Sequence, residues 1–276
     1  MTVRFVWVFG AFALLFSLER RRPLRRTVEP TLDRAERNLV MAGLAAAALQ
    51  MTERPVTQRL TALVERRRWG LLRAIVLPRQ IEAVIALLLL DYTLYLWHVL
   101  THRVPQLWRL HIVHHVDLDL DASTALRFHA AELLVAVLWR AGQILCFGIT
   151  RSTLSLWQTL TLLSVLFHHS NVRLPIEFER NLVRFIVTPR MHGIHHSTVH
   201  AETDSNWSSG LTIWDRLHGT LRLDVPQDAI TIGVPAYREP NELGLINLLS
   251  MPFVRQRPVW CGWNGHVPVR EPANQM

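Results

Sequence analysis

The sequence predicts an all-α fold: a polytopic membrane helical bundle of about four to five spans with a cytosolic, histidine-rich helical cap. Three observations predict it. Half of the 276 residues are hydrophobic and the mean hydropathy is +0.16, which is high for a soluble protein. The hydrophobic residues gather in long runs with few charges. Eight histidines are spaced by three or four residues within their groups, and this spacing returns to one face of a helix.

The apolar runs are each slightly shorter than the ~20 residues that a membrane-spanning helix needs. We therefore expect the helices to continue beyond the bilayer as polar extensions that carry the histidines. The run that is too short to be secure, Leu39–Leu49, is either a span extended by its neighbours or a re-entrant segment. The five runs are Val3–Leu18, Leu39–Leu49, Ile81–Trp97, Leu133–Ile149 and Leu154–Phe167.

The last two runs read as a helical hairpin that turns at 150–153. A hairpin that crosses the membrane twice returns the chain to the face it left. The histidines before and after the hairpin are therefore expected on one side of the membrane.

The net charge of +8 comes entirely from arginine, because lysine is absent. The arginines flank apolar runs, which suits lipid headgroups better than nucleic acid, so no nucleic-acid partner is expected. Arginines at positions 20–26 outweigh Arg4, which places the N-terminus outside and the arginine cluster in the cytosol. Exclusive use of arginine hints at a GC-rich bacterial genome. We expect an integral protein of the bacterial inner membrane whose active site faces the cytosol.

Three regions are expected along the chain. Residues 1–80 form an N-terminal membrane and interfacial region, and residues 81–220 form the histidine-bearing catalytic domain. Residues 221–276 form a proline-rich tail that packs on the cap or on the membrane surface. The two cysteines, Cys146 and Cys261, imply neither a disulfide framework nor a cysteine metal site.

The histidines predict a metal centre, because neutral imidazole is the commonest side-chain metal ligand. Eight rings exceed the three protein ligands that a catalytic zinc ion takes, so two ions fit the number better. Helix geometry suggests that the pairs 111/114 and 192/195 share one ion and that His115 and His196 turn toward the other. His129 and His169 are further candidates. The candidate ligands are His98, His102, His111, His114, His115, His129, His169, His192, His195 and His196.

Three polar residues are candidates to orient these rings. Asp91 lies seven residues before His98, on the same helix face, and an acidic residue inside a span is costly without a role. Its expected role is to accept the second N–H of a ligating imidazole, and the alternative is an ordinary interfacial aspartate. Asp204 and Asn206 follow the third histidine group and are expected to serve in the same way.

Three classes of function stay open on the residues alone. A zinc-dependent membrane hydrolase is disfavoured, because the string His-Glu-x-x-His is absent and no carboxylate lies inside a histidine group. A non-enzymatic haem-binding or metal-binding membrane protein is the second class. The third is oxygen activation at iron. Soluble di-iron bundles use Glu-x-x-His motifs, which are missing here, so this would be a histidine-dominated site.

The spacing of these groups resembles the three boxes of the fatty acid hydroxylase / sterol desaturase superfamily over roughly residues 85–220. The boxes are His98-x-x-x-His102, His111-x-x-His114-His115 and His192-x-x-His195-His196. Companion strings that match are Leu126-Arg127-Phe128-His129 with Glu132, His169-Ser170-Asn171, Thr188-Pro189-Arg190-Met191 and Trp214-Asp215-Arg216-Leu217. Ala130 and Val99 depart from the family pattern, which puts the substrate in doubt but removes no box histidine.

The resemblance implies a membrane-bound non-haem di-iron oxygenase with two iron ions. Such enzymes hydroxylate or desaturate a lipid C–H bond with O2 and two electrons. An electron donor such as a ferredoxin, or a cytochrome with its reductase, is implied as a partner, and the apolar substrate is expected to enter from the bilayer. The sequence leaves hydroxylation, desaturation and ether cleavage as alternatives.

Overall fold

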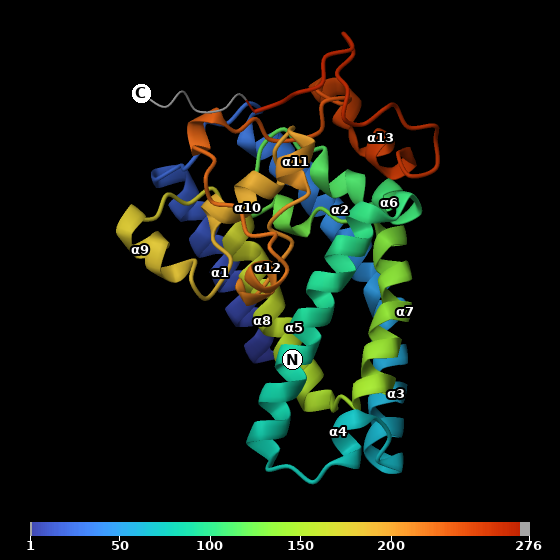
Figure 1. Ribbon diagram of the computed structural model, residues 1–276. Coiled ribbons are helices and arrows are strands. Elements are labelled where there is room, and N and C mark those ends of the chain that lie inside the picture. Colours follow the sequence, from blue (N-terminus) through green and yellow to red (C-terminus); the bar gives the residue numbers. More distant parts are fainter. Residues whose placement is uncertain (1, 271–276) are drawn as a thin grey trace.

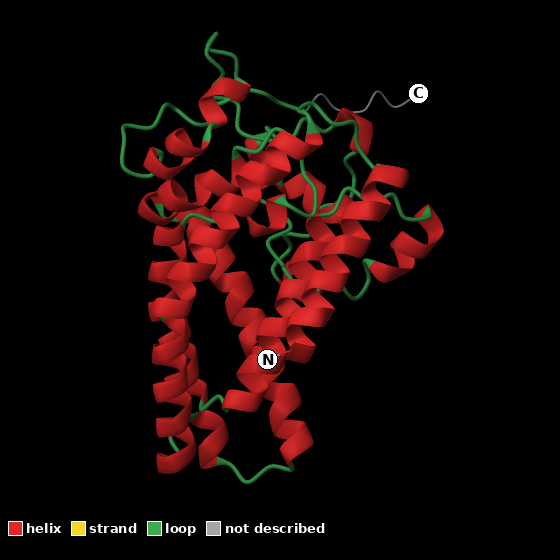
Figure 2. Cartoon of the chain, turned by 180° about the vertical axis from the view of Figure 1, so that it is seen from behind, coloured by secondary structure: helices red, strands yellow, loops and turns green. Residues whose placement is uncertain are grey.

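The computed structural model describes residues 2–270, with side chains from Val6 onward, and all regular structure in this part of the chain is helical. Figure 2 shows helices joined by loops, and the only strand-like pairing in the described range is three isolated bridges. The all-α prediction is therefore confirmed.

Most of the long helices lie between a cap, at the top of Figure 1, and the opposite end of the bundle, whereas the first helix starts at the N-terminus partway along it. The helices Thr31–Met51 and Glu53–Arg67 together form the pass that descends from the cap. Only Thr52 separates them, and its N–H donates to the carbonyl of Ala48 at 3.0 Å. The segment Leu39–Leu49 lies inside this pass. The long helices are α1 (Thr2–Arg21), α2 (Thr31–Met51), α3 (Glu53–Arg67), α5 (Arg79–Arg103), α7 (Ala130–Phe147) and α8 (Arg151–His169).

The expected hairpin is present as α7 and α8, but its turn lies at 148–150 and not at 150–153. Gly148, with φ of +76°, ends α7 in the left-handed conformation that glycine adopts without strain. Thr150 then caps α8 by accepting the N–H of Thr153. Gly70 packs so closely on this turn that a Cβ there would lie 2.4 Å from the Cα of Gly148. The start of α7 and the end of α8 both lie at the cap (Figure 1).

Two helices in the described residues are long and apolar enough to cross a membrane, α5 with mean hydropathy 1.8 and α7 with 1.5. The prediction was four to five spans. Length and composition do not single out α2 and α8, because α2 begins with a charged stretch around Asp33 and Arg34 and α8 carries polar residues such as Gln158. Only 28% and 22% of the apolar windows of α5 and α7 are buried, whereas the core helix of a soluble protein is mostly buried.

The cap consists of α6 (Pro105–His115) and short helices from the second half of the chain. A hydrophobic cluster in the cap joins Trp108 and Ile112 of α6 to Val234, Tyr237 and Leu248 of the C-terminal segment. The short helices are α9 (Ile176–Leu182), α10 (Pro189–His195), α11 (His200–Thr203), α12 (Ile213–Leu217) and α13 (Leu245–Ser250). At the opposite end, α4 (Leu71–Ala74) connects α3 to α5.

Candidate metal centre

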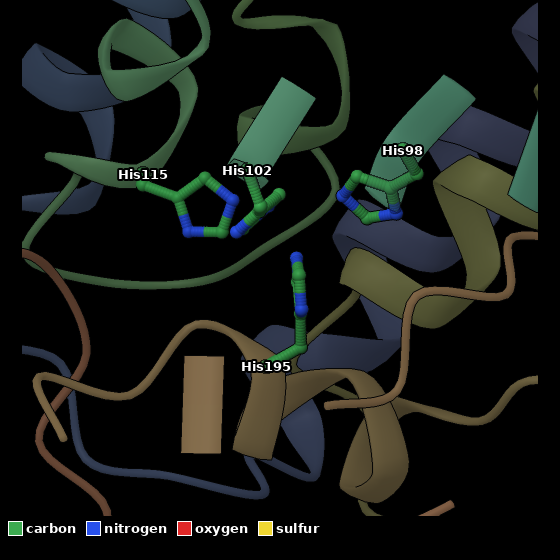
Figure 3. Close-up of side chains that lie close together, drawn as sticks. All are labelled: His98, His102, His115 and His195. Atoms are coloured by element: carbon green, nitrogen blue, oxygen red, sulfur yellow. The ribbon is translucent and has the colours of Figure 1, made fainter. Parts of the chain in front are cut away.

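Two groups of four histidines lie side by side in the cap. In each group the candidate ligand nitrogens lie within 4.8 Å of one another. Figure 3 shows the first group, in which two rings from α5, one from α6 and one from α10 point toward a common centre. The first group is His98, His102, His115 and His195, and the second is His114, His169, His192 and His196.

Histidines that are adjacent in the sequence belong to different groups. His114 and His115 end α6 and point to separate groups, and His195 and His196 do the same at the end of α10. The pairing 192/195 that helix geometry favoured is wrong, because His192 shares its group with His196 instead. His115 and His196, which were expected at one ion, also lie in different groups.

The second group has the nitrogen spacing of a metal site. The Nε2 atom of His169 lies 3.0 Å from that of His114 and 3.1 Å from that of His192, and His192 lies 3.1 Å from His196. Imidazole nitrogens that share one ion at about 2.1 Å lie about 3.0–3.4 Å apart. The residues therefore fit a bound metal ion.

The second nitrogen of several rings is held by an acceptor. The Nδ1 atom of His98 donates to the carbonyl of Trp207 at 2.7 Å, and that of His195 donates to Ser205 at 2.8 Å. Such a bond fixes the tautomer that leaves a lone pair on Nε2. The Nε2 atoms of His115 and His195 are buried and have no hydrogen-bond partner in the protein. Buried polar atoms rarely stay unpaired, which supports a cation at this centre.

Burial also keeps His115, His195 and His196 neutral. It lowers the pKa of His195 to about 3 and the pKa of His115 and His196 well below the ordinary value. The neighbouring imidazoles lower the pKa of His115 and His196 further, because several like charges would otherwise share one site. Neutral imidazole is the form that binds a metal ion.

Two further histidines border the groups. His168, which the sequence reasoning missed, is 1% exposed, and its ring centroid lies 4.2 Å from that of His192. The sequence feature that could have identified His168 is its adjacency to His169, because the second and third boxes also contain adjacent histidines. His111, a predicted ligand, lies 4.9 Å from His115 between ring centroids but belongs to neither group of four.

The structure places His129, another predicted ligand, away from both groups. It is the N-cap residue of α7, where its Nδ1 accepts the N–H of Ala131 at 3.1 Å. Its Nε2 lies 3.1 Å from the carbonyl of Leu249. Both nitrogens therefore have backbone partners, and His129 fixes the start of a helix.

None of the three residues expected to orient the rings bonds a box histidine. Asp91 accepts the backbone N–H of Leu211 at 3.0 Å and the indole N–H of Trp214 at 2.7 Å. Asp204 lies 3.4 Å from Arg103 and 3.5 Å from His200.

Asn206 forms hydrogen bonds with the backbone and not with a histidine ring. Its amide donates to the carbonyl of Met191 at 2.9 Å and accepts from the N–H of Arg222 at 2.7 Å. Together with Asp91 it therefore fixes the loop that carries the Trp207 carbonyl, and so acts on His98 indirectly.

Two carboxylates that the sequence reasoning did not assign take the orienting roles. Glu132 accepts from the Nδ1 of His111 at 2.8 Å. Asp215 accepts the N–H groups of Trp207 and Ser208 at 3.0 and 2.9 Å, and so fixes the loop whose carbonyl orients His98. Their positions in the sequence could have indicated these roles. Glu132 lies in the first turn of the helix after the second box, and Asp215 lies in the string Trp214-Asp215-Arg216-Leu217.

His111 belongs to neither group, but it borders the first one and its Nε2 is buried without a hydrogen-bond partner. Replacing Glu132 by glutamine is therefore expected to lower turnover about 10–100-fold while much of the metal stays bound. The amide oxygen still accepts the His111 hydrogen bond but lacks the negative charge of the carboxylate, so it holds the ring less firmly. Metal content by mass spectrometry and turnover should be measured on the same preparation. Wild-type turnover in Glu132→Gln would show that this bond has no part in the reaction.

Comparison with known proteins agrees with this geometry. The family model described as "Fatty acid hydroxylase" matches residues 83–220. The chain is 30% identical to the ornithine lipid hydroxylase OlsE of Rhizobium tropici over 184 residues, which cover 65% of this chain and 52% of that protein. It is 31% identical to the cholesterol 25-hydroxylase of Rattus norvegicus over 149 residues, 51% of this chain and 47% of that protein.

A third relative is the alkylglycerol monooxygenase of Homo sapiens, 29% identical over 139 residues, which cover 50% of this chain and 30% of that protein. The chain thus spans about half or less of the length of these curated relatives. No solved structure matches the chain significantly.

Proposed function

Since the chain belongs to the fatty acid hydroxylase family, we propose that it is a membrane-bound non-haem di-iron oxygenase that hydroxylates or desaturates a lipid C–H bond. The observation that carries this proposal is the pair of four-histidine groups. His115 of the first group stacks on His196 of the second, with ring centroids 4.3 Å apart, so two bound ions would be neighbours. Relatives whose names state lipid or sterol hydroxylation support the reaction class.

The eight histidines of the two groups would hold the irons, which when bound supply the activation of O2 and the acceptance of two electrons. The protein contributes a preorganised, buried set of neutral rings. His98, 8% exposed, is the ring of the first group that lines the adjoining cavity. The other three rings of that group do not line this cavity, so we expect the substrate to approach the first ion past His98.

An apolar substrate site adjoins the rings. A cavity of about 430 Å³ extends from His98, His114 and His168 between α2, α5, α7 and α8, and Leu94 and Leu162 are among its lining residues. Its volume lies in the range of ordinary small-molecule sites. We propose that it holds the hydrocarbon part of a lipid and excludes water from the C–H bond that reacts.

The membrane assignment rests on exposed apolar side chains on the long helices. Leu138 of α7 is 75% exposed and Val84 of α5 is 55% exposed, and such surfaces suit lipid contact. Exposed arginines at positions 20–22 lie at the end of α1, where it joins the cap. By the positive-inside rule this supports the proposal that the cap faces the cytosol, where a ferredoxin or a cytochrome with its reductase would deliver electrons.

Metal analysis tests the proposal. The purified protein in lipid nanodiscs is expected to bind about two irons per chain and to show no Soret band. Lipid extracts from cells with and without the gene should differ by an oxygenated or desaturated lipid whose formation requires O2. Zinc in place of iron would support the hydrolase instead, and a Soret band would support a haem carrier. Either result would contradict the oxygenase.

A further inference from the structure

The end of the cavity that lies away from the histidines is polar. The lining changes along α8 from Val165 and Leu162 to Gln158, and along α7 from Leu133 to Arg140. Ten residues of helix separate Gln158 from His168, which corresponds to about 15 Å. The cavity therefore has a histidine end and a polar end, joined by an apolar middle.

Four polar side chains meet at that end, and we call them the deep polar cluster: Glu53, Arg140, Gln143 and Gln158. Gln158 donates to Oε1 of Glu53 at 2.8 Å, and the Nε of Arg140 lies 3.8 Å from the same oxygen. Arg140 also donates to Oε1 of Gln143 and lies 4.1 Å from the ring centroid of Trp157. The cluster thus joins α3, α7 and α8.

The hydrogen bonding of this cluster is incomplete. The Nε–H of Arg140 is buried and lacks a hydrogen-bond partner, since 3.8 Å to Glu53 is too long for a hydrogen bond. A buried donor without a partner is unfavourable, and a ligand that accepts from it would relieve the deficit. The cavity brings such a ligand to the cluster, because Arg140 and Glu53 both line it.

The paired charges indicate which ligand fits. Glu53 would repel a carboxylate or phosphate, and Arg140 would repel an ammonium group. A hydroxyl group carries one donor and two acceptor lone pairs, so it can donate to Glu53 and accept from Arg140 at once. A hydrocarbon would leave both charges without a new partner.

We propose that the deep polar cluster binds the hydroxyl group of a neutral lipid and thereby sets which carbon, about 15 Å away, faces the histidines. The choice of carbon rests on the proposed oxygenase function. The binding of the hydroxyl group does not, so it is tested without turnover.

The test is saturation binding of tritiated 1-dodecanol to the iron-loaded protein in nanodiscs, with unlabelled competitors. The extended chain of 1-dodecanol is about as long as the cavity. We expect specific binding that dodecanoate and n-dodecane displace at least about 10-fold less well than 1-dodecanol does. Arg140→Met is expected to weaken 1-dodecanol binding about 10–100-fold, because a charged donor is lost.

Glu53→Gln is the sharper variant, because it is nearly isosteric and removes only the charge that repels an anion. Dodecanoate should then compete about 10-fold better than with the wild type, since Arg140 is left without a countercharge. Arg59→Met, which removes an exposed arginine of the same helix α3, is the matched control and should bind as the wild type does. Thermal melting checks that each variant is folded.

The proposal would be overturned if n-dodecane displaced 1-dodecanol as well as the alcohol itself. It would also be overturned if Arg140→Met bound 1-dodecanol as tightly as the wild type does, or if dodecanoate competed no better with Glu53→Gln than with the wild type. Loss of the oxygenase function would appear differently, as missing iron or missing turnover with the binding preferences intact.

Discussion

His196→Ala is expected to abolish turnover and to remove about one of the two irons that the wild type is proposed to bind. The ring lies at the junction of the two groups, with its Nε2 3.1 Å from that of His192 and its face stacked on His115. Loss of a residue that only orients a ligand lowers metal affinity or activity about 10–100-fold, and loss of a ligand should exceed that. His115→Ala should do the same to the other ion.

Iron content by mass spectrometry and product formation by lipid analysis measure the two effects separately. His266→Ala is the matched control, because that histidine is exposed and lies far along the chain from the boxes. It should keep both irons and full turnover. If His196→Ala kept two irons and normal turnover, His196 would not be a metal ligand.

Asp117→Asn is expected to give the largest loss of stability among single charge-removing changes, about 3–5 kcal/mol of unfolding free energy. Asp117 is fully buried between two fully buried arginines. Its carboxylate lies 3.1 Å from Arg34 of α2 and 3.0 Å from Arg127, in the segment that leads into α7. Removing the charge leaves Arg127 without its ion-pair partner and leaves Arg34 with only Asp119 and Asp121, in a site that water does not reach.

A matched control is Asp224→Asn, whose carboxylate is 73% exposed in its pair with Arg222 and should change stability by less than about 1 kcal/mol. Thermal melting should show the Asp117→Asn variant lower by roughly 6–20 °C. A shift as small as the control's would show that the network does not stabilise the cap.

The effect should depend on pH. Arg127 and Arg34 lower the pKa of Asp117 to about 2 from its ordinary value of 3.8. A lowered carboxyl pKa contributes stability that is complete above pH 3.8 and is lost as the pH falls through about 2. The difference in melting temperature between wild type and Asp117→Asn should therefore shrink over that range.

The sequence by itself determined the helical class and the meeting of the three boxes at one end of the bundle. Both follow from local rules. The three- and four-residue spacings of His111, His114 and His115 are helical. The hairpin runs along the bundle twice, in opposite directions, and so returns the chain to the cap. The family also follows from these boxes and the motifs between them.

The tertiary structure decided which histidine joins which group, because the local rules give a face of a helix but not what faces it. His195 and His196 are adjacent in sequence, yet the end of α10 sends them to different groups. His129 looked like a ligand and is a helix cap, since Ala131 and Leu249 supply its nearest polar partners. Glu132 orients His111 for the same reason: hydrogen-bond partners are set by distance in space, which the packing of α6 against α7 fixes.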